Sequence, residues 1–174
     1  VRLVITEAAL RGIRVVPEFD LPGHSQAIGA SHPKLLTACR DGWSEPLDVT
    51  KKEVYPFVLR LYDEINATFP DGWIHIGGDE VNMDCWKKNE AIQHWKKVHN
   101  MTDDVEVLQF FESKLLWYIT KKIRKRPIVW QELFDSGLDI PKNVVVDVWK
   151  EWIRNDSTHK ATAEEFNVIV SSCW

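Results

Sequence analysis

Apolar residues along the chain gather in short continuous runs whose length is typical of buried strands. Five such runs lie at residues 13–19, 73–78, 127–132, 144–149 and 167–172. Between them, apolar residues recur every three or four positions, which predicts helices at about 51–69, 88–97 and 105–124. A polar loop is expected from the first strand to about residue 50, and only a short helix, around 162–166, between the last two strands. The chain also opens on a helix pattern, residues 1–10, that stops before Gly12.

The alternation of short apolar strands with helices predicts a parallel sheet that is buried on both faces. A doubly wound sheet and a (β/α) barrel both have this order, but the dinucleotide-binding pattern G-x-G-x-x-G follows none of the strands. Polar or aromatic residues follow nearly every strand instead, which is where barrel enzymes carry their active sites. These residues are Glu18 and Asp20, Asp79 and Glu80, Trp130 and Glu132, and Trp149 and Lys150. The sequence therefore predicts an α/β fold, an incomplete (β/α)8 TIM barrel.

The composition excludes some functions without choosing one. The chain has 174 residues, of which 44% are hydrophobic and 28% charged, as in ordinary globular domains. The net charge of −4 leaves no basic footprint for nucleic acid. No apolar run approaches the roughly 20 residues of a membrane-spanning helix. Because a helix pattern is under way at the first residue and a strand pattern at the last, we expect residues 1–174 to be part of one domain of a longer protein.

Two adjacent carboxylates, Asp79 and Glu80, follow the strand that ends in two glycines. Like charges beside a buried strand repel each other and lose solvation, so a purely structural role is hard to justify. Adjacent residues cannot easily flank a sugar from opposite sides, as the two carboxylates of ordinary glycosidases do. They can divide the work on one side, one protonating a leaving oxygen while the other orients a substrate group. The alternative is that they cap the following helix.

Two further stretches carry candidates for the same site. In EFDLPGHS, either the strand simply ends in a Pro-Gly turn or the segment aims Asp20 or His24 at the acids. Trp130 and Trp149 occupy matching places at the ends of consecutive strands. A single tryptophan is most often a core residue. Two at strand ends near an acid pair favour the walls of a pocket.

A metal site is the third chemistry to consider. His75 and Asp79 are both of ligand type and lie close in sequence. No second histidine stands at a usable spacing, and His75 is expected to be an interior residue. The sequence therefore predicts neither a metal nor a cofactor.

Four blocks occur in order along the chain: RGIRVVPEFDLPGH, FPDGWIHIGGDEV, PIVWQELFD and VVVDVWK. Together they resemble the catalytic barrel of the family 20 glycoside hydrolases, the β-N-acetylhexosaminidases, and the eukaryotic lysosomal and secreted members in particular. The resemblance covers essentially the whole chain. It implies that the five strands are the third to seventh of the barrel. Strands one, two and eight and an N-terminal accessory domain would then lie outside this chain.

The resemblance also implies roles for the candidates. Glu80 matches the general acid/base and Asp79 the residue that orients the substrate's 2-acetamido group. Trp130 and Trp149 match aromatic walls around that group, and His24 matches a histidine of the active-site network. The implied reaction is retaining hydrolysis of terminal non-reducing β-linked N-acetylglucosamine or N-acetylgalactosamine residues. The acetamido oxygen is the nucleophile and the intermediate is oxazoline-like, so no carboxylate is needed on the opposite face.

Alternatives to this activity remain open from the sequence. One is a catalytically silent sugar-binding homologue on the same barrel, against which the intact acids and tryptophans argue. Another is a barrel hydrolase of a different class, either metal-dependent or chitinase-like. The chitinase-like pattern D-x-x-D-x-D-x-E is absent. Relatives hold the sugar with an upstream arginine and acid and a downstream tyrosine and acid that this chain lacks, so residues 1–174 alone are expected to be inactive.

Cysteines and glycosylation signals bear on the compartment. Three cysteines allow at most one internal disulfide, and their number leaves the pairing open. The resemblance implies a bridge between Cys39 and Cys85 and gives Cys173 no partner. Sequons for N-glycosylation begin at Asn66, Asn100 and Asn155, where chance predicts about 0.6 sequons. A lysosomal or secreted protein is therefore expected. The implied partners are N-acetylhexosamine-terminated glycans, as glycoconjugates or chitooligosaccharides, and lysosomal members of the family are dimers.

Overall fold

The computed structural model describes residues 1–39 and 44–172, and its centre is a parallel sheet of four strands. These are β3 (Trp73–His75), β4 (Arg126–Trp130), β5 (Val145–Val148) and β6 (Asn167–Val170). They lie in chain order, and every neighbouring pair is parallel. A sheet that keeps chain order without reversing is an arc of a barrel, whereas a doubly wound sheet reverses at a switch point. The predicted α/β fold and partial barrel are confirmed.

The first predicted strand, residues 13–19, lies beside β3 but is not a regular strand. Glu18 and His75 form an isolated parallel bridge. The His75 N–H donates to the Pro17 carbonyl at 2.9 Å, and the Phe19 N–H donates to the His75 carbonyl at 3.1 Å. Pro17 has no N–H to contribute, so a regular ladder cannot form through it. The prediction placed this segment correctly and was wrong about its regularity.

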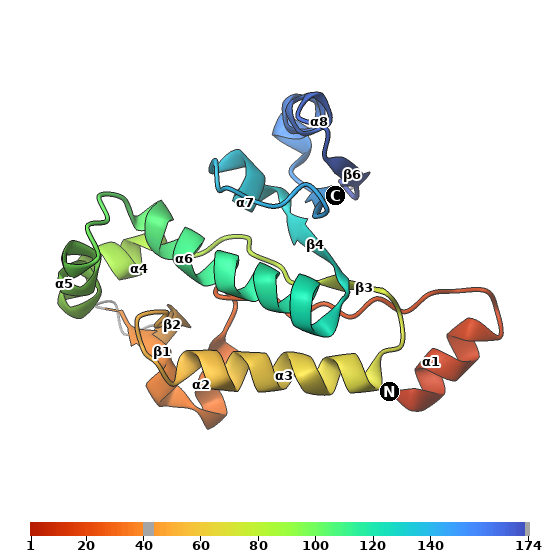
Figure 1. Ribbon diagram of the computed structural model, residues 1–174, viewed down its shortest axis with the longest axis horizontal. Helices are drawn as coiled ribbons and strands as arrows, with labels where there is room; N and C mark the ends of the chain where they lie inside the picture. The colour runs from red at the N-terminus through yellow and green to blue at the C-terminus, as the bar shows by residue number, and fades with distance from the viewer. Residues whose placement is uncertain (40–43, 173–174) are drawn as a thin grey trace.

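The two long helices occupy their predicted places. α3 (Val54–Thr68) and α6 (Asp104–Trp117) run alongside each other (Figure 1), and α6 continues as the π-helical turn Tyr118–Ile123. A capping box of Asp103 and Glu106 begins α6. The Tyr118 hydroxyl donates to Asp63 Oδ1 at 2.7 Å and so links the two helices.

The shorter elements surround this frame. They are α1 (Arg2–Ala9), α2 (Gln26–Ser31), the 3-10 turn Pro33–Leu35, α4 (Met83–Lys88), α5 (Glu90–Val98), α7 (Gln131–Asp135), η3 (Glu151–Ile153) and α8 (Arg154–Ala163). The predicted polar loop contains an antiparallel pair, β1 (Leu36–Ala38) and β2 (Ser44–Leu47). A disulfide joins Cys39, just after β1, to Cys85 in α4, with the Cα atoms 5.1 Å apart. The implied pairing is confirmed, and Cys173 lies outside the described residues.

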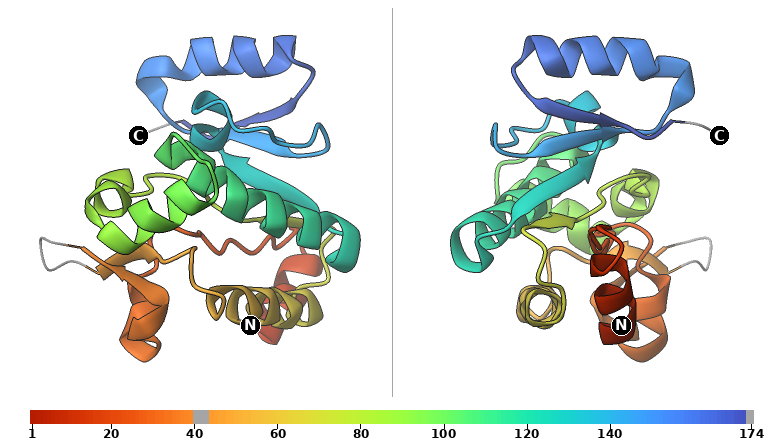
Figure 2. Two further views of the ribbon diagram at one scale, coloured as in Figure 1. Left: turned by 60° about the vertical axis from the view of Figure 1, so that its left-hand side comes forward. Right: turned by 90° about the vertical axis from the view of Figure 1, so that its right-hand side faces the viewer.

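The expected short helix before the last strand is wrong in position and length. α8 has ten residues and ends where the prediction begins. It lies against β5 and β6 at one end of the molecule (Figure 2). The residues that it buries are Ser157 and Ala161. Such small residues leave no apolar periodicity in the sequence, so the pattern could not reveal this helix.

The core lies between the sheet and the helices. Fully buried members include Tyr62, Ile74, Ile76, Trp86, Phe111, Leu115, Leu133 and Val146. The carboxyl end of β3 rests on this core, so the residues that follow it start from a rigid base. Among the described residues, no helix combines the length and apolar character needed to cross a membrane.

Candidate functional site

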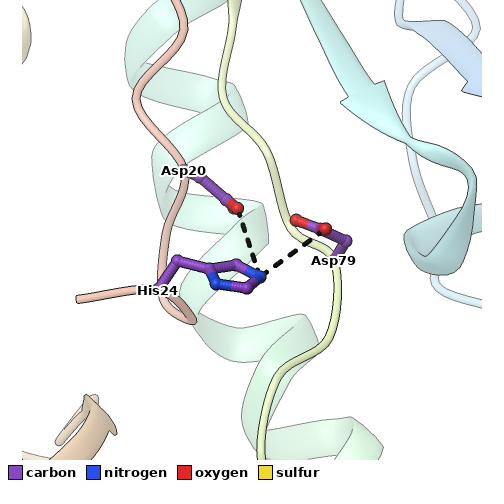
Figure 3. A group of neighbouring side chains, drawn as sticks. All are labelled: Asp20, His24 and Asp79. Atoms are coloured by element: carbon purple, nitrogen blue, oxygen red, sulfur yellow. Dashed lines mark ion pairs between the residues drawn. The ribbon is translucent and has the colours of Figure 1, made fainter. Parts of the chain in front are cut away.

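Four polar side chains from two segments meet at the carboxyl end of β3. Asp79 and Glu80 follow β3, while Asp20 and His24 follow the segment beside it. His24 Nε2 lies 3.7 Å from Asp20 Oδ2, 3.6 Å from Asp79 Oδ2 and 3.7 Å from Glu80 Oε2. Figure 3 shows the imidazole turned toward Asp20 and Asp79. The segment EFDLPGHS therefore faces the acid pair, as the second interpretation of that sequence expected.

The backbone around the acids occupies the left-handed region. Gly77 and Gly78 have φ of 74° and 99°, and Glu80 and His24 both have φ of 46°. A Cβ on Gly77 would overlap the Asp20 carboxylate, and one on Gly78 would lie 2.7 Å from Leu133 Cδ1. Only glycine fits both positions. Left-handed backbone is uncommon at other residues and is found at active sites, and here Glu80 and His24 adopt it.

Asp20 is a protonated acid within this group. The Gly78 N–H donates to Asp20 Oδ1 at 2.8 Å. Burial raises the pKa of Asp20 to about 9, and its hydrogen bond with Asp79 acts in the same direction. At neutral pH Asp20 therefore keeps its proton and donates a hydrogen bond to Asp79. The sequence named Asp20 only as an alternative to His24, because the proximity of the two acids is a tertiary contact.

Asp79 presents an unused acceptor. Its Oδ1 is buried and has no hydrogen-bond partner among the described residues. A buried carboxylate oxygen without a donor costs free energy, about 1–3 kcal/mol or more for a charged group. A ligand that brings an N–H or O–H to this oxygen would relieve that cost.

Glu18, Trp130 and His75 form the inner wall beside the acids. The Trp130 Nε1–H donates to Glu18 Oε1 at 3.0 Å, and the His75 ring lies 4.4 Å from the Trp130 ring. Burial raises the pKa of Glu18, and the nearby charges of Asp79 and Asp147 raise it further. Sequence reasoning noted Glu18 at a strand end but assigned it no role, because its partner is 112 residues away.

His75 is an interior residue, as expected. Its Nδ1 accepts the Gly77 N–H at 3.1 Å, while its Nε2 is buried 3.9 Å from Asp147 Oδ2, without a hydrogen-bond partner among the described residues. Burial lowers the pKa of His75 to about 4, so the ring is neutral at physiological pH. It therefore supports Gly77 and Trp130 without adding charge.

Trp149 forms the second aromatic wall. Its ring lies 6.4 Å from that of Trp130 at an angle of 67°. The Trp149 Nε1–H donates to both oxygens of Glu132, at 3.2 and 3.0 Å, and Lys150 Nζ lies 2.9 Å from the same carboxylate. This double contact holds the indole in one orientation. The two tryptophans thus lie side by side, as their matching strand positions predicted.

Gln131 supports this wall from behind and was missed from the sequence. It is fully buried, and its Oε1 accepts the N–H groups of Trp149 and Lys150 at 2.9 and 2.7 Å. Its Nε2 donates to Asp135 and to Ser157 in α8. A polar residue directly after an apolar run is the only signal in the sequence, and many exposed residues share it.

A cation is one ligand that the cluster could be tested for. Asp20, His24 and Asp79 offer ligand-type atoms that all lie within 4.8 Å of one another. The raised pKa of Asp20 favours its protonated form, which donates a hydrogen bond to Asp79, and Asp20 would have to lose that proton to bind a cation. The arrangement is better described as a hydrogen-bonded acid network. The pair considered from the sequence, His75 with Asp79, is not the cluster that the structure assembles.

Comparisons with known proteins identify the family of the chain. The model of the glycosyl hydrolase family 20 catalytic domain matches residues 1–173. The chain is 38% identical over 179 residues to mouse β-hexosaminidase subunit beta, covering 100% of this chain and 33% of that protein. The human subunit beta is also 38% identical, with 32% of its length covered. The chain thus spans about a third of these curated relatives.

A solved structure gives the same result. The chitobiase of Flavobacterium johnsoniae superposes with a TM-score of 0.86 at 29% identity, covering 98% of this chain and 27% of that one. Family model, relatives and structural neighbour all point to one enzyme family. The chain belongs to glycosyl hydrolase family 20, as part of its catalytic domain.

Proposed function

We propose that the protein containing this chain hydrolyses terminal non-reducing β-linked N-acetylglucosamine and N-acetylgalactosamine residues, with retention and with assistance from the substrate. The observation that carries the proposal is the buried, unpartnered Oδ1 of Asp79 beside Glu80. An acetamido N–H is a donor of the kind that this oxygen lacks. Relatives named β-hexosaminidase, and a Vibrio harveyi β-N-acetylglucosaminidase solved with N-acetylglucosamine (TM-score 0.81, 29% identity), support the substrate class.

In the first step, Glu80 donates its proton to the glycosidic oxygen as the bond to the anomeric carbon breaks. The acetamido carbonyl oxygen attacks the same carbon and closes an oxazoline-like ring. Asp79 accepts the acetamido N–H and offsets the positive charge that develops on the ring. In the second step, the Glu80 carboxylate takes a proton from water, which opens the ring from the face of the departed group. Two displacements at one carbon give net retention.

The surrounding residues supply geometry to these steps. Asp20, protonated, donates a hydrogen bond to Asp79 and so helps to keep that side chain oriented. Trp130 and Trp149 would enclose the acetyl methyl and hold the carbonyl oxygen near the anomeric carbon. Asp79 and Glu80 both lie against the one imidazole nitrogen of His24. This common position suits work on one side of the sugar, whereas a two-carboxylate mechanism needs groups on opposite faces.

Kinetics of the full-length protein with Asp79→Asn and Glu80→Gln test the proposal. Azide should rescue Glu80→Gln mainly for substrates with good leaving groups, because they need no proton. Asp79→Asn should weaken the binding of a thiazoline that mimics the oxazoline. Proton NMR of the first-formed product should show the β-anomer. Unchanged rates in both variants would reject the mechanism, and tight glycan binding without turnover would favour a silent sugar-binding protein.

For the isolated chain we propose no turnover of a chromogenic N-acetylglucosaminide, since it spans only about a third of its curated relatives. Turnover that depends on Glu80 would contradict this expectation.

For the compartment we propose the lysosome or secretion. The Cys39–Cys85 disulfide supports an oxidising route, and all three sequon asparagines, at positions 66, 100 and 155, are exposed. Mass loss on treatment with an endoglycosidase would test their occupancy.

A further inference from the structure

A third tryptophan, Trp152, lies at the outer end of a row of indole rings. The row begins with Trp130, which contacts the buried His75. Trp149 follows at 6.4 Å, and Trp152 follows Trp149 at 6.1 Å with an angle of 78° between the rings. The row therefore leads from the inner wall of the site toward solvent.

Trp152 differs from the other two rings in its exposure. It is 74% exposed, while Trp130 and Trp149 are half-buried and donate their Nε1–H groups to carboxylates. It lies in η3, directly after β5, and the turn before it is held by the buried Gln131 through two backbone N–H groups. An aromatic face that is exposed yet held by a fixed turn can bind a flat ligand with little loss of conformational entropy.

We propose that Trp152 is a stacking platform for the sugar on the reducing side of the scissile bond. This inference rests on the proposed function. If the terminal sugar lies between Asp79 and the walls formed by Trp130 and Trp149, the next sugar leaves the pocket at its rim. β5 is two strands away from β3, about 10 Å across the sheet, so the rim residue is within reach of a second sugar ring. The apolar face of an indole suits the flat C–H face of a pyranose.

A glycan is the other ligand that could cover the Trp152 ring, and the experiment must distinguish it from the substrate. Asn155, a sequon asparagine, follows Trp152 by three positions and is also exposed. Residues three apart are neighbours on a helical surface. A glycan on Asn155 could therefore cover the same indole.

The experiment compares two substrates on the full-length protein. N,N′-diacetylchitobiose has a sugar on the reducing side, whereas methyl N-acetyl-β-glucosaminide has only a methyl group. Trp152→Ala should raise KM about 5- to 10-fold for chitobiose and less than about twofold for the methyl glycoside. Trp152→Phe keeps an aromatic face and should stay close to wild type. Trp117→Ala, at a tryptophan on α6 that is 53% exposed, should change neither KM.

Several outcomes would overturn the platform. Equal changes for both substrates would mean that Trp152 merely supports Trp149, and no change for either would mean that it does not touch substrate. If Asn155→Gln produced the chitobiose effect by itself, or abolished that of Trp152→Ala, the occupant would be the glycan.

Calorimetry in a Glu80→Gln background separates this inference from the proposed function. If the wild-type protein never hydrolyses chitobiose, while chitobiose affinity in the Glu80→Gln background still falls with Trp152→Ala, the function is rejected and the platform is kept. Hydrolysis that depends on Glu80 but not on Trp152 would reject the platform alone.

Discussion

The two halves of the site are held in place by different means. The acid half, residues 20–24 and 77–80, is shaped by backbone: two glycines and two other residues in the left-handed region. The tryptophan half, residues 130–132 and 147–150, is shaped by side chains, with Gln131 and Glu132 bonded to the backbone and indole of Trp149. A substitution that the left-handed backbone cannot accept should therefore disturb the whole acid half. Loss of one hydrogen bond in the tryptophan half should remove one contact and leave the others in place.

The largest effect is expected from Gly77→Ala in the acid half. The methyl group would overlap the Asp20 carboxylate, and the residue would be held at a φ of 74°. We expect a loss of about 3 kcal/mol or more in the free energy of unfolding, together with loss of activity, measured by urea unfolding and by kinetics. Gly137→Ala is the matched control, because its φ is 76° and nothing lies within 4 Å of the added methyl. It should cost only about 1–2 kcal/mol. Equal losses would mean that contact with Asp20 is unimportant.

The next largest effect is expected from Gln131→Leu in the tryptophan half. The leucine would leave the N–H groups of Trp149 and Lys150 without their acceptor. Unpaired groups of this kind cost about 1–3 kcal/mol each, so the unfolding midpoint should fall clearly. Gln109→Leu provides the comparison. Gln109 also bonds through both ends of its amide, to Ser113 and Asp139, but it is only partly buried. A larger fall in the unfolding midpoint for Gln109→Leu than for Gln131→Leu would contradict the role given to Gln131 in the tryptophan half.

A smaller effect, measured on activity, is expected from Glu132→Ala. Trp149 would lose the acceptor of its Nε1–H, and Lys150 would lose its ion pair. A freer indole should lower kcat/KM for N-acetylglucosaminides by about 10-fold, a barrier increase of about 1.4 kcal/mol. Glu164→Ala removes an exposed pair with Lys142 and should leave kcat/KM unchanged. Wild-type kinetics for Glu132→Ala would show that Trp149 needs no such anchor.

The last effect is a change with pH and not a loss at one pH, and it is expected from Asp20→Asn. The pKa of Asp20 is raised to about 9 in the folded protein, against about 3.9 when unfolded. The stability that Asp20 contributes is therefore complete below about pH 4 and declines as pH rises toward 9. Asparagine can replace the protonated acid, so the Tm of Asp20→Asn relative to wild type should rise across that range. Asp84→Asn, at an exposed carboxylate, should show no such trend. Parallel pH profiles for wild type and Asp20→Asn would contradict a protonated Asp20.

Local patterns predicted the sheet and the long helices because their apolar positions are regular. The helix α8 escaped prediction since the residues that it buries, Ser157 and Ala161, are too small to mark a face. The segment 13–19 was predicted as a strand from its apolar run, but Pro17 limits its pairing to a single bridge. In both cases the fold depends on contacts that composition does not record.

The sequence by itself determined which chemical groups stand at the ends of the strands: the adjacent acids, His24 and the two tryptophans. Their order and spacing along the chain follow from local periodicity, which the chain carries before it folds. Only the tertiary structure decided that Asp20 hydrogen-bonds to Asp79, that Gln131 holds Trp149, and that Trp152 extends the aromatic row. The first two effects need burial and proximity across 59 and 18 positions of sequence, and neither exists until the strands are side by side.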